Sequence, residues 1–443
     1  MRTRDLVMPC NAVEMSADDR PLVLFVAPYF LPAYYGGVVQ VYLGLLQRMT
    51  GFHVIVVADR QGCTLADQVA WDAAASTLHP FRMERLDAIE FHLQREQKQR
   101  LSIPLLAPIV QIGRFLLHGR HQWKTLLSQL RPDLIVCGGT YSAGWLMSEV
   151  PRSIPIVNYV HGEELTMQLS PRFLMHWMRR QQMRGLRAAT LNVVVSQYTA
   201  QMVESLSGAH KSSIKVLPNF VDTSRFRISG ERNELRRRFG WEGKLVVLTL
   251  ARLEPRKGID QALRALAMIK EAGRLPANCI YVIAGRGREG DELKALSNAL
   301  GLSDCVCFRG FVQESDVPAL YEAADIFIQP NRDIGGDTEG FGVVFLEGSA
   351  CGVPVIGGIA GGTADAIAEG VSGFRVDGES VEEIARVLGQ LIEDPELRRR
   401  LGDEGARRVA NLFTVERAAL DFESLLSEVL AQHKSGTPSS AND

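Results

Sequence analysis

The sequence predicts an α/β protein of two domains, each built on a doubly wound parallel sheet. The chain has 443 residues, 46% of them apolar and 23% charged, so it is too long for one compact core but ordinary in composition. Short apolar runs alternate with segments of helical spacing along most of its length. These elements fall into two consecutive series, separated by a charged stretch.

The first series opens with a strand, a glycine loop, a helix and a second strand. Residues 21–28 form an apolar run that ends in proline, as a buried parallel strand would. Gly36 and Gly37 follow in a loop, and apolar residues at helical spacing then lead to the run HVIVVA at 53–58. This order is typical of a βαβ unit. Further strands are expected at 133–137, 154–159 and 191–195, and a last strand followed by a turn at 214–222.

The second series follows a polar stretch at 225–243 that is rich in Arg and Glu. We place the domain junction at the start of this stretch, which gives domains of 21–224 and 225–412. Strands of the second domain are expected at 245–252, 279–285, 305–311, 326–330 and 352–358.

Charge, cysteines and apolar runs exclude several classes of protein. The net charge of −2 gives no indication of a nucleic-acid partner. No apolar segment resembles a secretory signal or reaches the roughly 20 residues of a membrane span, so a soluble or surface-bound protein is expected. Seven irregularly spaced cysteines indicate a reducing compartment rather than a disulfide framework. Cys305 and Cys307 are expected in the core, because no second Cys/His pair completes a zinc site.

Basic residues follow the first strand of the second domain. In TLARLEPRKG, Arg252 comes directly after the strand and Lys257 lies where a helix begins. Cations at the carboxyl end of a parallel strand face the ligand crevice, and a helix N-terminus also favours anions. The pair suits a diphosphate; the alternative is a solvated basic loop.

Two carboxylates lie eight residues apart in DTEGFGVVFLEG. Glu339 is in a glycine-rich loop and Glu347 two turns into the next helix, a span of roughly 12 Å. This exceeds the about 5 Å between the carboxylates of a retaining glycosidase, so they could instead hold two ends of one long ligand. The alternative is a pair of surface carboxylates. Free backbone N–H groups between them form a second anion site, from Gly340, Phe341, Gly342 and Val343.

Two further motifs follow strands. Gly285 begins a GxGxxG pattern, but it follows the second strand of its domain and no acidic residue ends the next strand. A tight turn near a nucleotide therefore explains it better than a nicotinamide fingerprint does. His161 follows a strand and precedes a glycine, which favours a ligand contact over a structural role.

Together these segments resemble the GT4 family of glycosyltransferases, which have the GT-B fold of two Rossmann-like domains facing a central cleft. The similarity extends from about residue 21 to about residue 430, and the spacing of Glu339 and Glu347 around Gly-Phe-Gly is its most specific feature. The other matching segments are Gly36-Gly37, His161-Gly162, LPNFVD at 217–222, Arg252 with Lys257-Gly258, AGRG at 284–287 and ACGVPVIGG at 350–358.

The resemblance implies roles for these residues. Arg252 and Lys257, helped by Arg256, would hold the donor diphosphate beside Gly258. Glu347 would bind the ribose. Glu339, His161 and the amides of 341–343 would contact the transferred sugar. Gly37 would let its loop approach the diphosphate. The remaining implied positions are Gly285 near the nucleotide, Val312 beside the base, and a last helix within 413–430 packed back on the first domain.

The resemblance also implies a retaining reaction, in which the departing diphosphate assists deprotonation of the acceptor. No DxD motif is found, so neither a metal nor any other cofactor is expected besides the nucleotide-sugar, which is a co-substrate. The stretch 331–347 is similar to phosphatidylinositol mannosyltransferase-like members, which favours GDP-mannose over a UDP-hexose.

The acceptor is expected to be a sugar or a lipid-linked sugar in glycan, glycolipid or polysaccharide biosynthesis. Two basic amphipathic stretches, 95–124 and 172–187, could bind an anionic membrane surface or could pack their apolar faces on the domain. The expected location is cytoplasmic, with the inner face of the plasma membrane as a peripheral site. The alternatives are a sugar-nucleotide epimerase, a nicotinamide dehydrogenase and a non-catalytic nucleotide-sugar binding subunit.

Overall fold

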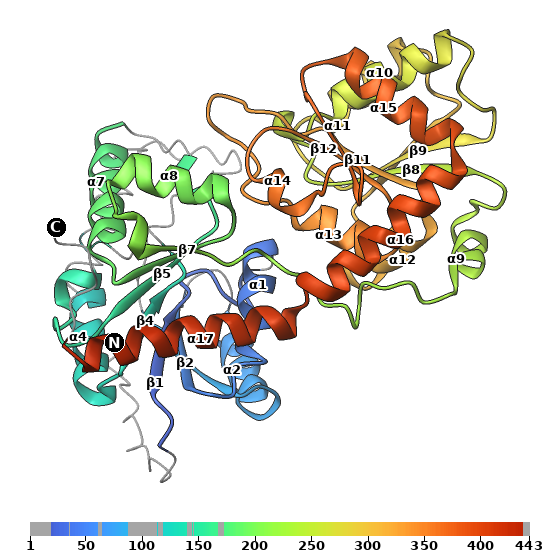
Figure 1. Ribbon diagram of the computed structural model, residues 1–443. Helices are drawn as coiled ribbons and strands as arrows, with labels where there is room; N and C mark the ends of the chain where they lie inside the picture. The colour runs from blue at the N-terminus through green and yellow to red at the C-terminus, as the bar shows by residue number, and fades with distance from the viewer. Residues whose placement is uncertain are drawn as a thin grey trace, which may run out of the picture.

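The computed structural model describes residues 19–34, 36–60, 64–86, 113, 118–139, 144, 146–166 and 172–436. In this part of the chain, two parallel sheets form separate domains that lie side by side (Figure 1). The expected architecture of two doubly wound domains is therefore confirmed.

The first sheet is buried on both faces. Val23 and Phe25 of its central strand face one core, whereas Leu24 and Val26 face another that contains Trp123. This two-sided burial explains why the strands are continuous apolar runs in the sequence. In spatial order β3-β2-β1-β4-β5-β6-β7, the described strands are β1 (Leu22–Val26), β2 (His53–Asp59), β3 (Phe81–Leu86), β4 (Leu134–Cys137), β5 (Ile156–Val160), β6 (Leu191–Val194) and β7 (Ile214–Val216).

The second sheet repeats this arrangement. Val246 and Leu248 face one core and Val247 between them faces the other. In spatial order β10-β9-β8-β11-β12-β13, its strands are β8 (Leu245–Leu250), β9 (Cys279–Ala284), β10 (Val306–Gly310), β11 (Ile326–Gln329), β12 (Val355–Gly358) and β13 (Gly373–Val376).

Helices connect the strands of both sheets. In the first domain these are α1 (Gly37–Leu46), α2 (Leu65–Leu78), α4 (Arg120–Leu130), α6 (Glu163–Thr166), α7 (Arg172–Ala188) and α8 (Gln197–Ser207). In the second they are α9 (Arg232–Phe239), α10 (Ile259–Glu271), α11 (Gly290–Ala299), α12 (Val317–Ala323), α13 (Val343–Ala350), α14 (Thr363–Ala366), α15 (Val381–Glu393) and α16 (Pro395–Leu412).

The sequence does not predict strands β3 and β13. β3 and β13 lie at sheet edges, where one side of a strand has no neighbour. β3 also carries Arg82, Glu84 and Arg85, so its apolar pattern is interrupted. In the segment 214–222, expected to hold a strand and a turn, the strand is Ile214–Val216 and the rest leads toward the second domain.

Both sheets reverse their strand order next to the first strand of the domain. β1 lies between β2 and β4, and β8 lies between β9 and β11. Loops that leave neighbouring strands at such a point run in opposite directions and leave a crevice. The loop after β1 carries Gly36 and Gly37, and the loop after β8 carries Arg252.

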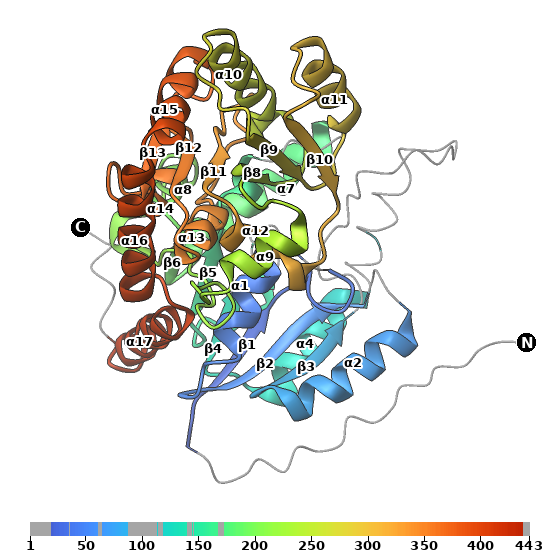
Figure 2. The ribbon, with the colours of Figure 1, turned by 90° about the vertical axis from the view of Figure 1, so that its right-hand side faces the viewer.

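The last helix, α17 (Val415–Lys434), returns to the first domain (Figures 1 and 2). Phe422 is fully buried and packs edge-on against Tyr159 of β5, with 5.5 Å between ring centroids. Glu423 Oε1 accepts hydrogen bonds from the backbone N–H groups of Thr50 and Gly51, both at 2.7 Å. We accordingly propose domain limits of 21–224 and 225–412, with 413–430 packed on the first domain.

Helix α7 tests the two interpretations of the basic stretch at 172–187. Met178 and Leu186 are buried in separate apolar clusters of the first domain, so this part of the helix packs inward. The stretch at 95–124 lies mostly outside the described residues. No helix among the described residues is both long enough and apolar enough to cross a bilayer.

One core assignment is wrong. Cys305 is buried as expected, but Cys307 is exposed because it lies on β10, an edge strand of the second sheet. Cys305 precedes that strand and packs in the core behind α10 and α11.

Replacing Phe422 should test the contribution of α17 to the first domain. We expect Phe422→Ala to lower the free energy of unfolding by about 3–5 kcal/mol, because it leaves a cavity against Tyr159. Leu420→Ala is the matched control, since its side chain on the same helix is 68% exposed. Urea denaturation followed by circular dichroism measures both; equal midpoints would show that α17 is not part of this core.

Candidate active site

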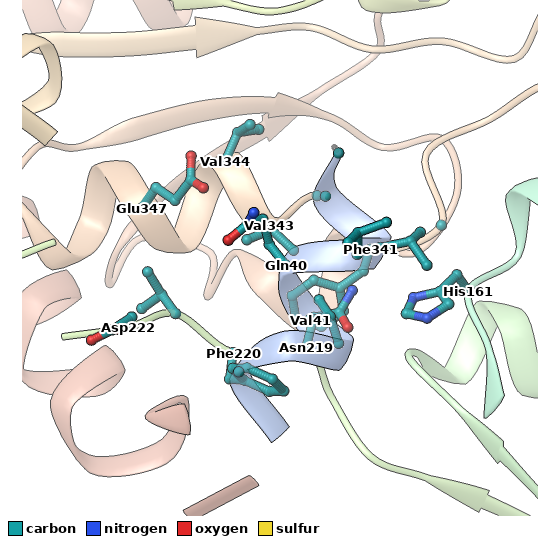
Figure 3. A pocket seen from close by; sticks show the side chains of 18 of the residues that line it. Gln40, Val41, His161, Asn219, Phe220, Asp222, Phe341, Val343, Val344 and Glu347 are labelled. Atoms are coloured by element: carbon teal, nitrogen blue, oxygen red, sulfur yellow. The ribbon is translucent and has the colours of Figure 1, made fainter. Parts of the chain in front are cut away.

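A cavity of about 750 Å³ lies between the two domains. Its first-domain wall comes from α1, the turn after β5 and residues 219–222, and its second-domain wall from residues 225–226, the loops after β8 and β11 and the start of α13 (Figure 3). Twelve of the residues singled out from the sequence line it: Gly36, Gly37, His161, Arg252, Arg256, Lys257, Glu339, Gly340, Phe341, Gly342, Val343 and Glu347.

The basic residues after β8 form a compact turn. Arg256 and Lys257 are buried, in a single 3-10 turn, whereas the Arg252 side chain is 60% exposed. Gly258 ends the turn with φ of +67° and is also the N-cap of α10. A Cβ there would clash with the carbonyl oxygen of Pro330, so both its conformation and its surroundings require glycine.

Glu339 accepts from two of these cations. Lys257 Nζ donates to Glu339 Oε2 at 2.6 Å, and Arg256 Nη1 donates to the same oxygen at 3.0 Å. Burial alone would raise the pKa of Glu339, but Lys257 and Arg256 outweigh it and lower this pKa to about 2. Glu339 is therefore ionised at neutral pH and fixes the two cations beside the cavity.

Glu347 has a different environment. Tyr321 Oη donates a hydrogen bond to Glu347 Oε2 at 2.9 Å. Burial raises the pKa of Glu347 to about 7, and the Tyr321 hydrogen bond only partly opposes this. Glu339 and Glu347 thus have separate hydrogen-bond partners.

The loop between the two carboxylates touches the first domain. Ser196 Oγ donates to the Gly340 carbonyl at 2.8 Å. A Cβ on Gly340 would clash with the carbonyl oxygen of His161, so only glycine allows this approach. Gly342 has φ of +88° and directly precedes α13, whose first residue is Val343.

His161 is buried at the end of β5. Its ring stacks on Tyr159 at 5.0 Å between centroids and meets Tyr42 edge-on at 5.1 Å. Burial lowers the pKa of His161 to about 3, so its imidazole is neutral. The adjacent carboxyl of Glu164 accepts from the His161 backbone N–H at 2.9 Å, and burial raises the pKa of that carboxyl to about 7. A neutral imidazole at a cavity wall suits contact with hydroxyl groups.

Two family models match the two halves of the chain. The model described as "Glycosyltransferase Family 4" matches residues 35–225, and the model described as "Glycosyl transferases group 1" matches residues 231–408. The two ranges contain all twelve of the cavity residues named above. The chain belongs to glycosyltransferase family 4.

Named relatives match about half of this family 4 chain. A GDP-mannose-dependent alpha-(1-6)-phosphatidylinositol monomannoside mannosyltransferase of Mycolicibacterium smegmatis is 34% identical over 254 residues, 56% of this chain and 64% of the relative. A D-inositol 3-phosphate glycosyltransferase of Salinispora tropica is 34% identical over 238 residues, 51% and 48% of the two chains. The chain thus spans between about half and two thirds of the length of these curated relatives.

Solved structures share the fold at lower identity. HepE of Anabaena, solved with UDP and glucose, has a TM-score of 0.70 and 21% identity over 92% of this chain and 100% of that one. Sucrose-phosphate synthase of Thermosynechococcus elongatus has a TM-score of 0.70 and 20% identity over 93% and 100%. At such identities the likeness establishes the GT-B fold.

Three of the residues assigned to the nucleotide do not line the cavity. Gly258 caps α10 as described above, and Val312 packs against an apolar cluster. Gly285 has φ of +127°, and a Cβ there would clash with the carbonyl oxygen of Ala251. Close packing of the loops after β8 and β9 therefore explains this glycine without any ligand.

Other cavity residues were not assigned roles from the sequence. Glu163 directly follows the predicted His161-Gly162 pair, and its Oε1 lies 2.6 Å from Arg256 Nη2. Asn219 lies in the matching segment LPNFVD, and it is buried with an Oδ1 that has no protein partner among the described residues. Both residues lie in or next to segments that match the family, so they could have been predicted as site residues. The sequence does not show which residues of such a loop face the other domain. Among the described residues, no group of His, Cys, Asp or Glu side chains is arranged to hold a metal ion.

Adding a methyl group at Gly340 should hold the domains apart. We expect Gly340→Ala to increase the radius of gyration and to lower stability by about 1–3 kcal/mol, because its Cβ would meet the His161 carbonyl. Gly290→Ala is the control, since a Cβ there makes only ordinary contact with Leu253. Small-angle scattering and thermal melting check both variants. An unchanged scattering profile would contradict the close approach described here.

Proposed function

We propose that the protein transfers a hexosyl group from a nucleotide-sugar to a sugar or lipid-linked acceptor, with retention of configuration and without a metal ion. One observation carries this proposal: buried Arg256 and Lys257 adjoin an interdomain cavity that also holds Glu339 and Glu347. Fixed cations at this position would offset the negative charge that grows on the departing diphosphate.

The remaining residues fit the parts of such a donor. Glu347 would accept hydrogen bonds from the ribose, while Glu339 and the amides at the start of α13 would contact the sugar. Neutral His161 would contact a sugar hydroxyl from the first domain. Val312 and Gly285 stay proposed neighbours of the nucleotide on family resemblance only, since neither lines the cavity.

GDP-mannose is the proposed donor, with a UDP-hexose as the alternative. The mycobacterial relative is named as GDP-mannose-dependent, whereas the Anabaena HepE structure holds UDP and glucose. A lipid-linked acceptor is proposed because the name of that relative includes phosphatidylinositol monomannoside, a glycolipid. A cytoplasmic location at the inner face of the plasma membrane would follow from such an acceptor.

Thermal stabilisation by GDP, UDP, GDP-mannose, UDP-glucose and NAD tests the donor class. Stabilisation by one sugar nucleotide above the others supports the proposal and names the donor. Product analysis with that donor then separates transfer to an acceptor from epimerisation. Stabilisation by NAD alone would favour the dehydrogenase. Binding of a sugar nucleotide without any turnover would favour the non-catalytic subunit.

Lys257 should matter more for turnover than for donor binding. We expect Lys257→Ala to lower kcat by about 10²-fold or more with a smaller change in the donor KM, because the leaving-group charge is greatest in the transition state. Lys270→Ala is the control, because this α10 lysine pairs with Asp304 away from the cavity. Steady-state kinetics decide; a kcat within a few-fold of wild type would reject the assigned role.

Donor affinity should rise with pH through the titration of Glu347. A carboxyl with a pKa of about 7 is largely protonated at pH 6 and ionised at pH 8. Ribose hydroxyls donate to the ionised form, so GDP-mannose should bind about tenfold more tightly at pH 8 than at pH 6. Isothermal titration calorimetry measures the donor affinity at each pH. The affinity of Glu347→Gln should not depend on pH, whereas that of Glu164→Gln should still do so, because Glu164 does not line the cavity. If the donor affinity of wild type did not change between pH 6 and pH 8, the proposed contact between Glu347 and the ribose would be rejected.

A further inference from the structure

The proposed diphosphate site already contains more carboxylates than cations. Among the described side chains, three cations form ion pairs with four carboxylates within 4.0 Å. The cations are Arg252, Arg256 and Lys257, and the carboxylates are Glu163, Glu254, Asp337 and Glu339. A diphosphate would add further negative charge to this cluster, so its binding is favoured when one of the carboxylates moves away from the cations.

Glu163 differs from the other three carboxylates in its origin. It begins α6 of the first domain, whereas Glu254, Asp337 and Glu339 belong to the same domain as the cations. Its Oε1 lies 2.6 Å from Arg256 Nη2 and 3.6 Å from Arg252 Nη2. One carboxylate oxygen thus bridges the two arginines that the donor diphosphate would need.

Glu163 is more exposed than two of the other carboxylates, and it pairs with both arginines. Its side chain is 43% exposed, compared with 13% for Glu339 and 16% for Glu254. Its carboxylate is already partly hydrated, so moving it into water gives up the ion pairs with Arg256 and Arg252 in exchange for full hydration. Arg256 then keeps its ion pair with Glu339. Asp337 is more exposed still, at 54%, but its Oδ1 is 3.4 Å from Arg256 and it has no ion pair with Arg252.

We propose that Glu163 competes with the donor diphosphate for Arg256 and Arg252, so that the donor binds by displacing it. This rests on the proposed function, since it assumes that a diphosphate uses these cations. In the free protein Glu163 neutralises the arginines and links the domains through them. Each donor must break this link, and ligands with too little negative charge cannot do so. Glu163 is therefore a residue that sets donor affinity and selectivity from the acceptor-side domain.

Removing this charge should tighten the binding of diphosphates. We expect Glu163→Gln to bind inorganic pyrophosphate and GDP about three- to tenfold more tightly than wild type, which corresponds to the loss of one partly exposed ion pair. Glu163→Asp keeps the charge on a shorter side chain and should lie between the two. Isothermal titration calorimetry measures all three proteins.

Asp365→Asn separates competition for cations from simple loosening of the domain interface. Asp365 Oδ2 accepts from the Gln197 backbone N–H at 3.0 Å across the same interface, but it has no ion pair with any of the three cations. Competition predicts that this variant binds pyrophosphate as wild type does. Equal tightening in Asp365→Asn and Glu163→Gln would overturn the proposal in favour of loosening.

The remaining outcomes are also decisive. Unchanged or weaker binding in Glu163→Gln, with its melting temperature kept, would mean that Glu163 does not compete or itself contacts the ligand. If neither pyrophosphate nor GDP binds any variant, the donor site itself is wrong and the proposed function falls with it. If wild type binds GDP but Glu163→Gln gains nothing, the proposed function survives and only the competition is rejected.

Discussion

The carboxylate of Glu339 is held in a buried position between Lys257 and Arg256, and the arrangement of the cavity depends on this ion pairing. A buried carboxylate without such partners would be strongly unfavourable, so the cations determine where this loop lies. The loop in turn places Gly340 against the His161 carbonyl and starts α13 at Val343. One ion-paired cluster therefore orders the second-domain wall and its contact with the first domain.

The two carboxylates of this region have the same chemistry but opposite environments. Glu339 faces two cations, which hold its pKa low, whereas burial raises the pKa of Glu347, whose direct partner is the hydroxyl of Tyr321. Environments that separate the pKa values of like groups also separate their roles. Here Glu339 is a permanent negative charge that positions cations, whereas Glu347 can be neutral or ionised near neutral pH and accepts a hydrogen bond from a hydroxyl.

The sequence predicts much of the fold because both sheets are buried on two faces. Strands such as β1 and β8 are continuous apolar runs for that reason, and the glycines and charges after them line the interdomain cavity. The prediction is incomplete where burial is one-sided. β3 and β13 were missed, and Cys307 was wrongly placed in the core, because each lies on an edge strand whose pattern is only half apolar.

The sequence by itself determined the two-domain α/β architecture and the family, because periodicity and motif order are local properties of the chain. Only the tertiary structure decided which motif residues share the cavity. It showed that Gly285 packs against the Ala251 carbonyl in the loop after the neighbouring strand β8 and does not line the cavity. It also brought Glu163 onto Arg256, although 93 residues separate them. Contacts between domains depend on how the two sheets meet, and no local pattern encodes that geometry.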